Sequence, residues 1–348
     1  MKIESLDGLR GFSLLLVLIF HSFTPYTQGG FIGVEIFFVL SGFLITNLLL
    51  LEHEQYNKIR FKNFYMRRFL RLAPALLIMV TTFYVYSEFF TEGENKGEPI
   101  KVVLAALFYV ANFVRAYDWF PMGYLGITWS LSIEEQFYFI WPIFLLFLLT
   151  TIRNKMHVLY FVFFIVVLMW VNRSILVLSN TPVERLYFGT DTHSDGLLVG
   201  CIAAIFMTTH RNYFVQIIDI FGKMKIFIPL MAISFFVLST LFIGMYMRSI
   251  YIWYLPILEV VSAIFICYLY CEGSNNKILL FSNKYLVWLG SISYGVYLWH
   301  WFIYRVLHTY DIKGMSVVFI GGAISIAIAS LSYYFVEKPV LKLKSRYR

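Results

Sequence analysis

The stretch FIGVEIFFVLSGFLITNLLLL, residues 31–51, decides the class of fold. It carries one charged residue, Glu35, and it reaches the roughly 20 apolar residues that a helix needs to cross the hydrocarbon core of a bilayer. Similar segments recur along the chain, which has 348 residues, 60% of them hydrophobic and 14% charged. A soluble domain of this length is less apolar. The sequence therefore predicts an all-α polytopic membrane protein.

Reading the chain by this rule gives ten predicted spans. They cover residues 9–25, 31–51, 69–90, 129–150, 156–178, 194–210, 226–247, 250–270, 286–308 and 314–336. An eleventh apolar segment, Val102 to Phe113, is about twelve residues long, which is short for a crossing. We expect it to be re-entrant or to lie at the membrane surface. The whole of residues 1–348 is expected to form a single membrane domain.

The distribution of basic residues sets the predicted orientation. With ten spans, most Lys and Arg residues and both termini face the cytoplasm, as the positive-inside rule requires of a plasma (inner) membrane protein. The acidic stretch Ser87 to Pro99 is then outside. The net charge of +8 is explained by these short loops, so nucleic acid is not an expected partner. The three cysteines lack metal-ligand spacing, and neither a metal site nor a disulfide is predicted.

Titratable groups inside spans are costly and mark candidate functional sites. On this topology His21, Glu35, the pair Glu134 and Glu135, and Asp195 all fall in the outer half of the bundle, on four different helices. Glu35 and Asp195 are equally consistent with acids that cap a helix N-terminus. His300 is first read as a residue that forms a hydrogen bond across the bundle.

Arginines gather at the opposite, cytoplasmic end. Arg67, Arg68 and Arg71 begin the third span, with Pro74 one turn later, and Arg10 begins the first. Clustered guanidinium groups suit polyphosphate recognition, although basic residues at a helix end also serve as topology anchors. Arg10 and His21 are separated by a rise of roughly 16 Å along one helix, less than the reach of a pantetheine arm.

Several stretches together resemble the acyltransferase-3 family of membrane O-acyltransferases. The matching motifs are LDGLRG at 6–11 with His21, GVEIFFVLSGFLIT at 33–46, Arg67-Arg68 with Arg71 and Pro74, WSLSIEEQFY at 129–138, Asp195-Gly196-Leu197 with Gly200, Ser293-Tyr294 with Tyr297-Leu298-Trp299-His300, and Glu337-Lys338-Pro339. The resemblance covers nearly the whole chain in the family's order.

The resemblance implies acyl transfer to a hydroxyl of a bacterial cell-surface carbohydrate. It matches Arg10 and His21 to the family's essential arginine and histidine, Arg67, Arg68 and Arg71 to its acyl-CoA contact, and Trp129, Ser130 and Glu134 to its second signature. Glu35 departs from the aspartate that is more common in the family. Many relatives carry a fused serine-hydrolase-like domain. We expect none here, so that either this domain or a separate extracytoplasmic transferase delivers the acyl group.

The combined hypothesis is that acyl-CoA, expected to be acetyl-CoA, is a donor substrate rather than a resident cofactor. Its phosphates would lie on the arginines, and His21, oriented by Glu35 or Glu134, would act as general base. Trp129 or Ser130 would donate to the oxyanion, and Glu135, Asp195 and His300 would support the site. A nucleophilic triad of Ser130, His21 and Glu134 is an alternative. The sequence lacks the Gly-x-Ser-x-Gly elbow that often carries such a serine, which disfavours this alternative.

A proton-coupled exporter of a sugar or a lipid-linked glycan is the competing class, because buried acids and a histidine also form proton relays. The cytoplasmic arginine cluster and the lack of an internal repeat favour the enzyme.

Overall fold

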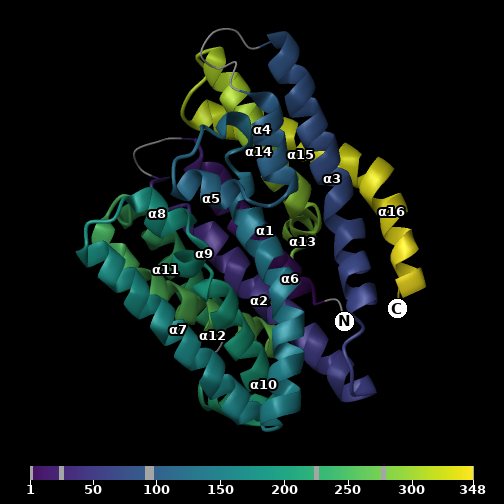
Figure 1. The fold of residues 1–348 in the computed structure, drawn as a ribbon. Coiled ribbons are helices and arrows are strands. Elements are labelled where there is room, and N and C mark those ends of the chain that lie inside the picture. The colour runs from purple at the N-terminus through teal and green to yellow at the C-terminus, as the bar shows by residue number, and fades with distance from the viewer. Residues whose placement is uncertain (1–2, 23–26, 91–97, 223–226, 276–279, 348) are drawn as a thin grey trace.

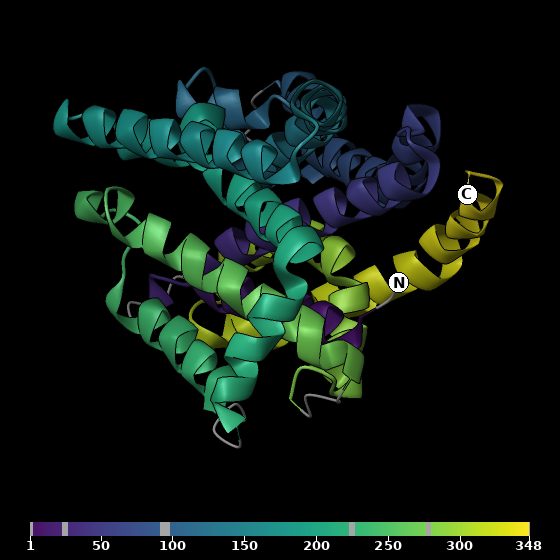
Figure 2. The same cartoon turned by 90° about the horizontal axis from the view of Figure 1, so that it is seen from below.

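The computed structural model describes residues 3–22, 27–90, 98–222, 227–275 and 280–347. Within these ranges the regular structure is helical and contains no strand, which confirms the all-α prediction. The helices form a bundle, drawn from two directions in Figures 1 and 2. The longer helices are α1 (Glu4–Phe20), α2 (Ile32–Tyr56), α3 (Phe61–Phe90), α6 (Thr128–Ile152), α7 (Lys155–Leu178), α10 (Asp195–Ile220), α11 (Ile228–Phe242), α12 (Tyr254–Asn275) and α14 (Ser293–Thr309).

Shorter elements connect or extend these helices. They are α4 (Pro99–Leu107), α5 (Ala111–Ala116), η3 (Gly123–Leu125), α8 (Val183–Phe188), α9 (Thr190–His193), η5 (Arg248–Tyr251), α13 (Lys284–Ser291), η6 (Val317–Gly321), α15 (Gly322–Ser332), η7 (Tyr333–Glu337), α16 (Lys338–Lys342) and η8 (Leu343–Tyr347). The elements from η6 to α16 follow one another without a break over residues 317–342.

Six helices of the described chain are long and apolar enough to cross a membrane. They are Ile32–Tyr56, Phe61–Phe90, Thr128–Ile152, Lys155–Leu178, Tyr254–Gly273 and Val317–Lys342. The other four predicted spans overlap α1, α10, α11 and the pair α13 and α14. The multi-pass architecture is therefore supported, while the count of ten stays a prediction.

The ambiguous segment Val102 to Phe113 is divided between two short helices. The nine residues of α4 rise only about 13.5 Å, less than half the thickness of the hydrocarbon core. The chain then turns at Tyr109, whose φ is 54°, and continues as α5. A segment of this shape fits the re-entrant prediction. Glu92 and Glu94 of the predicted acidic loop lie outside the described residues.

Glycines allow the helices that carry the family motifs to touch backbone to backbone. A Cβ at Gly42 of α2 would collide with the carbonyl oxygen of Leu197 in α10, and one at Gly200 of α10 would collide with that of Val39 in α2. In a bilayer, where packing rather than water drives association, small residues permit such an approach. This contact fixes α2 as one wall of the site described next.

Both ends of the chain lie near the lower end of α3 in Figure 1. Nη1 of Arg67 in α3 donates to the carbonyl oxygen of Tyr347 in η8 at 2.7 Å. The two termini are thus on one side of the bundle, which accords with an even number of crossings. Their cytoplasmic orientation stays a prediction.

Candidate active site

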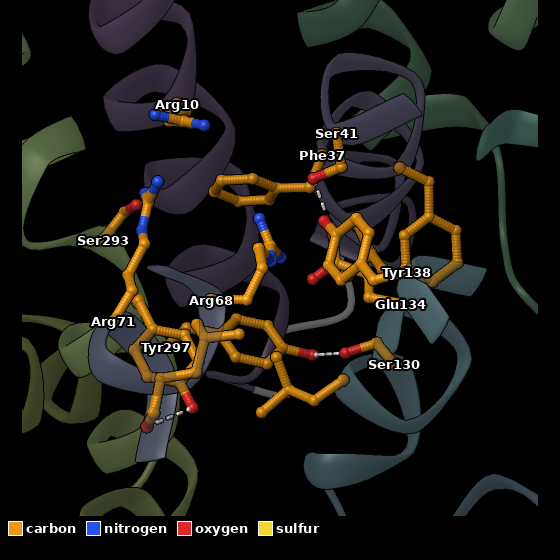
Figure 3. Close-up of a pocket in the computed structure, with 15 residues that line it drawn as sticks. Arg10, Phe37, Ser41, Arg68, Arg71, Ser130, Glu134, Tyr138, Ser293 and Tyr297 are labelled. Carbon is orange, nitrogen blue, oxygen red and sulfur yellow. Dashed lines mark hydrogen bonds between the residues drawn. The ribbon is translucent and has the colours of Figure 1, made fainter. Parts of the chain in front are cut away.

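Three cavities form a series in which each shares lining residues with the next. The inner cavity, near η8, has a volume of about 1030 Å³. It shares Arg10, Arg68 and Arg71 with a neck of about 90 Å³ that is drawn in Figure 3. The neck shares Val34 and Tyr297 with an outer cavity of about 390 Å³. The arginines and the histidine singled out from the sequence therefore line a series of neighbouring cavities.

The inner cavity is strongly basic. Its cationic lining residues are Arg10, Arg60, Arg67, Arg68, Arg71, Arg211 and Lys344, against the acids Asp7 and Glu52. Lys344 lies beyond the last span, and its burial, together with the nearby arginines of α3, lowers its pKa to about 8. An excess of cations over acids in a large cavity fits a polyanionic ligand.

The neck joins this basic region to the middle of the bundle. The Arg68 guanidinium lies 3.5 Å from the centre of the Tyr138 ring, and its Nη2 is 3.5 Å from Oε1 of Glu135. Arg10 and Arg71 enter from α1 and α3 (Figure 3). Three guanidinium groups thus line the smallest of the three cavities.

The two predicted residues on α6 in the neck have partners of their own. Ser41 donates to Oε1 of Glu134 at 2.8 Å, and the hydroxyls of Ser130 and Tyr297 are 2.5 Å apart (Figure 3). The alternative triad would need Ser130 and Glu134 to reach His21. The structure brings neither of them to that histidine, so it does not form the triad.

His21 lies in the outer cavity with Trp129. Its Nδ1 is 3.0 Å from the carbonyl oxygen of Val17, one turn earlier, and 3.1 Å from Nε2 of His300. The partner that orients His21 is therefore His300, and the expectation that Glu35 or Glu134 does so is corrected. His300 forms a hydrogen bond across the bundle, as the sequence predicts, and its partner is His21, the candidate base.

The hydrogen bonds fix which nitrogen of each ring carries the proton. Nδ1 of His300 lies 2.6 Å from the carbonyl oxygen of Tyr297, which only accepts, so this nitrogen donates and Nε2 keeps its lone pair. Nδ1 of His21 faces that lone pair and the Val17 carbonyl, so it also donates. The remaining nitrogen of His21, Nε2, then carries the lone pair that a general base needs.

Glu35 and Asp195 belong to a separate buried cluster behind the outer cavity. Oε1 of Glu35 lies 2.6 Å from Nε2 of His193, and Oδ2 of Asp195 lies 2.6 Å from Nη1 of Arg173. Glu259 accepts from Trp170 Nε1 at 3.2 Å and lies 3.9 Å from Arg173. Glu35 and Asp195, both predicted site residues, therefore support the wall of the outer cavity from behind it.

Sequence reasoning missed several members of this cluster. Arg173 and Glu259 are charged residues within predicted spans 156–178 and 250–270, so the cost of intramembrane charge could have identified them. His193 lies one residue before the predicted span 194–210. Among the described residues, no group of three or more His, Cys, Asp or Glu side chains could hold a metal ion.

Comparison with known proteins assigns the chain to a family. The acyltransferase domain family, Acyl_transf_3, matches residues 3–334. The chain belongs to the acyltransferase-3 family. No solved structure gives a significant match.

Curated members of the acyltransferase-3 family align with almost all of the chain. "Peptidoglycan O-acetyltransferase OatA" of Listeria monocytogenes is 36% identical over 98% of this chain and 56% of its own length. A "Putative O-acetyltransferase" of Staphylococcus aureus is 32% identical over 98% and 57%, and the "Putative peptidoglycan O-acetyltransferase YrhL" of Bacillus subtilis is 32% identical over 97% and 55%. The chain spans just over half the length of these relatives.

Proposed function

We propose that this protein transfers an acyl group, expected to be acetyl, from acyl-CoA in the inner cavity to a hydroxyl of a cell-envelope carbohydrate in the outer cavity. The observation that carries the proposal is the row of three cavities, with guanidinium groups at one end and His21 at the other. The names of the curated relatives, which are O-acetyltransferases, support the same reaction class.

The shape of the path suits the donor. The phosphates and nucleotide of coenzyme A would occupy the basic inner cavity, where paired guanidinium N–H groups bind phosphate oxygens. The slender pantetheine arm would fill the neck. The rise of roughly 16 Å between Arg10 and His21 on α1 would bring the thioester to the outer cavity.

The chemistry at His21 follows from its tautomer. Nε2 would take the proton of the acceptor hydroxyl as the oxygen attacks the thioester carbonyl carbon. The hydroxyls of Tyr297 and Ser130, at the junction of the neck and the outer cavity, and the indole of Trp129 are candidate donors to the oxyanion. When the C–S bond breaks, the imidazolium would return the proton to the CoA sulfur.

The first test measures binding and turnover of radiolabelled acetyl-CoA by the protein in nanodiscs. We expect His21→Ala to keep binding but lose turnover, and Arg71→Gln, which removes a charge shared by the inner cavity and the neck, to weaken binding. Arg153→Gln is the matched control, because Arg153 is an exposed arginine after α6 that lines none of the three cavities. If the wild type neither binds nor consumes acetyl-CoA, with or without peptidoglycan fragments, the proposal fails and export becomes the leading function.

A further inference from the structure

Arg115 is a cation in the outer cavity that the transfer mechanism does not use. It lies on α5 and lines the cavity together with His21 and Trp301. Its guanidinium carbon is 3.8 Å from the centre of the Phe188 ring, and its Nη1 donates to the carbonyl oxygen of Gly126 at 3.2 Å. Ring and carbonyl together hold the group in place.

This arginine has no carboxylate partner within 4.0 Å in the described part of the chain. Two other arginines near the outer end pair with acids, Arg173 with Asp195 and Arg185 with Asp191. Arg248 donates to the carbonyl oxygen of Val177, and Arg305 lies over the rings of Tyr124 and Trp301, but neither of these two lines the outer cavity. The outer cavity is lined by no aspartate or glutamate. A guanidinium group has five N–H donors, so most of the donors of Arg115 remain available to a ligand.

The helix that carries Arg115 is held firmly. One turn earlier, the Asn112 amide donates to the carbonyl oxygen of Phe188 at 3.2 Å and to Oγ1 of Thr190 at 2.9 Å. Nε2 of Gln136 in α6 donates to the Asn112 side-chain oxygen at 2.9 Å. This network joins α5 to α6 and to the segment from α8 to α9, so the guanidinium is positioned before any ligand arrives.

Arg115 and His21 flank one aromatic wall. The Trp301 ring centre lies 4.9 Å from that of His21, and its Nε1 donates to the carbonyl oxygen of Gly123 at 2.9 Å. The turn from Gly123 to Gly126 also receives the hydrogen bond from Arg115. A ligand in the cavity can therefore reach both groups with different parts of itself.

We propose that Arg115 binds an anionic group of the acceptor, a carboxylate or a phosphate, while a hydroxyl of the same molecule meets His21. The inference rests on the proposed function and names the substrate class, an anionic carbohydrate. A guanidinium pairs with either anion through two parallel N–H donors. A cavity with a fixed cation and no acid selects against neutral acceptors.

The test compares acceptors that are alike except at the anionic group. The protein in nanodiscs receives acetyl-CoA with N-acetylglucosaminyl-N-acetylmuramic acid, which carries a free carboxylate, or with its methyl ester. A 1-phosphate of di-N-acetylchitobiose, beside unmodified di-N-acetylchitobiose, tests the phosphate. We expect the wild type to favour one anionic acceptor over its neutral partner by about 10- to 100-fold in kcat/KM. Arg115→Met should lower kcat/KM for the anionic acceptor much more than for its neutral partner, so that the preference is lost. Arg115→Lys should keep part of it.

Each other outcome is decisive. Equal use of charged and neutral acceptors by the wild type, or an equal loss for both in Arg115→Met, overturns the proposal. If Arg115→Met does not fold, the wild-type comparison and Arg115→Lys decide. If acetyl-CoA is not turned over at all, the proposed function fails, and calorimetric binding of the same acceptor pairs still decides whether Arg115 selects the anion.

Discussion

Nε2 of His300 lies 3.1 Å from Nδ1 of His21, and both rings are buried. The pair places a neutral acceptor behind the candidate base, where other enzymes with a catalytic histidine use a carboxylate. When Nε2 of His21 takes a proton, the charge that develops on the ring is shared with the His300 lone pair and the Val17 carbonyl.

The first prediction concerns this pair. His300→Phe removes the acceptor that orients His21, so kcat should fall by about 100-fold or more while acetyl-CoA binding is unchanged. His300→Gln, whose amide oxygen can accept the same hydrogen bond, should retain more activity. Steady-state kinetics and equilibrium binding on the same nanodisc preparations measure both. Equal losses in the two variants would show that the ring only fills space.

A second prediction concerns the ion cluster behind the outer cavity. Arg173→Met leaves Asp195 and Glu259 without their buried cation, so the free energy of unfolding should fall by about 3–5 kcal/mol. Glu259→Gln is the matched variant, since it removes the more distant carboxylate and leaves the pair of Arg173 and Asp195. Unfolding of the detergent-solubilised protein measures both. A loss for Glu259→Gln as large as that for Arg173→Met would contradict the assigned pairing.

The contact between α2 and α10 gives a third prediction. Gly200→Ala forces a methyl group into the carbonyl of Val39 and should cost about 1–3 kcal/mol of stability. Gly196→Ala, one turn earlier, places its methyl at an ordinary 3.4 Å from the Cβ of Phe38 and should be tolerated. Thermal unfolding of both variants decides whether helix proximity, rather than helix propensity, explains the difference.

The fourth prediction follows from Lys344. Its pKa of about 8 in the unliganded protein means that it is charged at pH 6.5 and largely neutral at pH 9. Bound phosphates favour the charged form, so acetyl-CoA binding should take up close to one proton above pH 8 and none at pH 6.5, and affinity should fall as the pH rises. Calorimetry in buffers of different ionisation enthalpy measures the uptake. Lys344→Met should abolish it and Lys342→Met should not.

The sequence predicts the positions of the helices better than it predicts which side chains contact one another. Hydrophobic segments locate the helices, because a bilayer admits few alternatives. The break at Ile292 between α13 and α14 was not predicted, because residues 286–308 are mainly apolar and long enough for one span. At that break, Gly290 packs against the carbonyl of Asp7 in α1, a contact between segments that are far apart in sequence.

In the candidate site, too, the sequence predicts the depth of a residue in the membrane but not its contacts. Arg10, Arg68 and Arg71 meet in one neck as their membrane depth suggests, because depth follows from position along a span. Glu35 faces His193 and not His21. The rotation of α2 about its own axis decides which of these residues Glu35 meets. Rotation depends on packing against neighbours, and the pattern of α2, apolar on every side, does not encode it.

The narrow neck also bears on how a cell keeps its membrane energised. An enzyme that joins a cytoplasmic donor to an external acceptor needs a passage through the bilayer, and an open passage would dissipate the proton gradient. Under the proposed function, the cavity of about 90 Å³ lined by Arg10, Arg68 and Arg71 would lie on such a passage, and fixed positive charge repels hydronium and metal cations. The same guanidinium groups that suit coenzyme A would thus act as an electrical seal between turnovers.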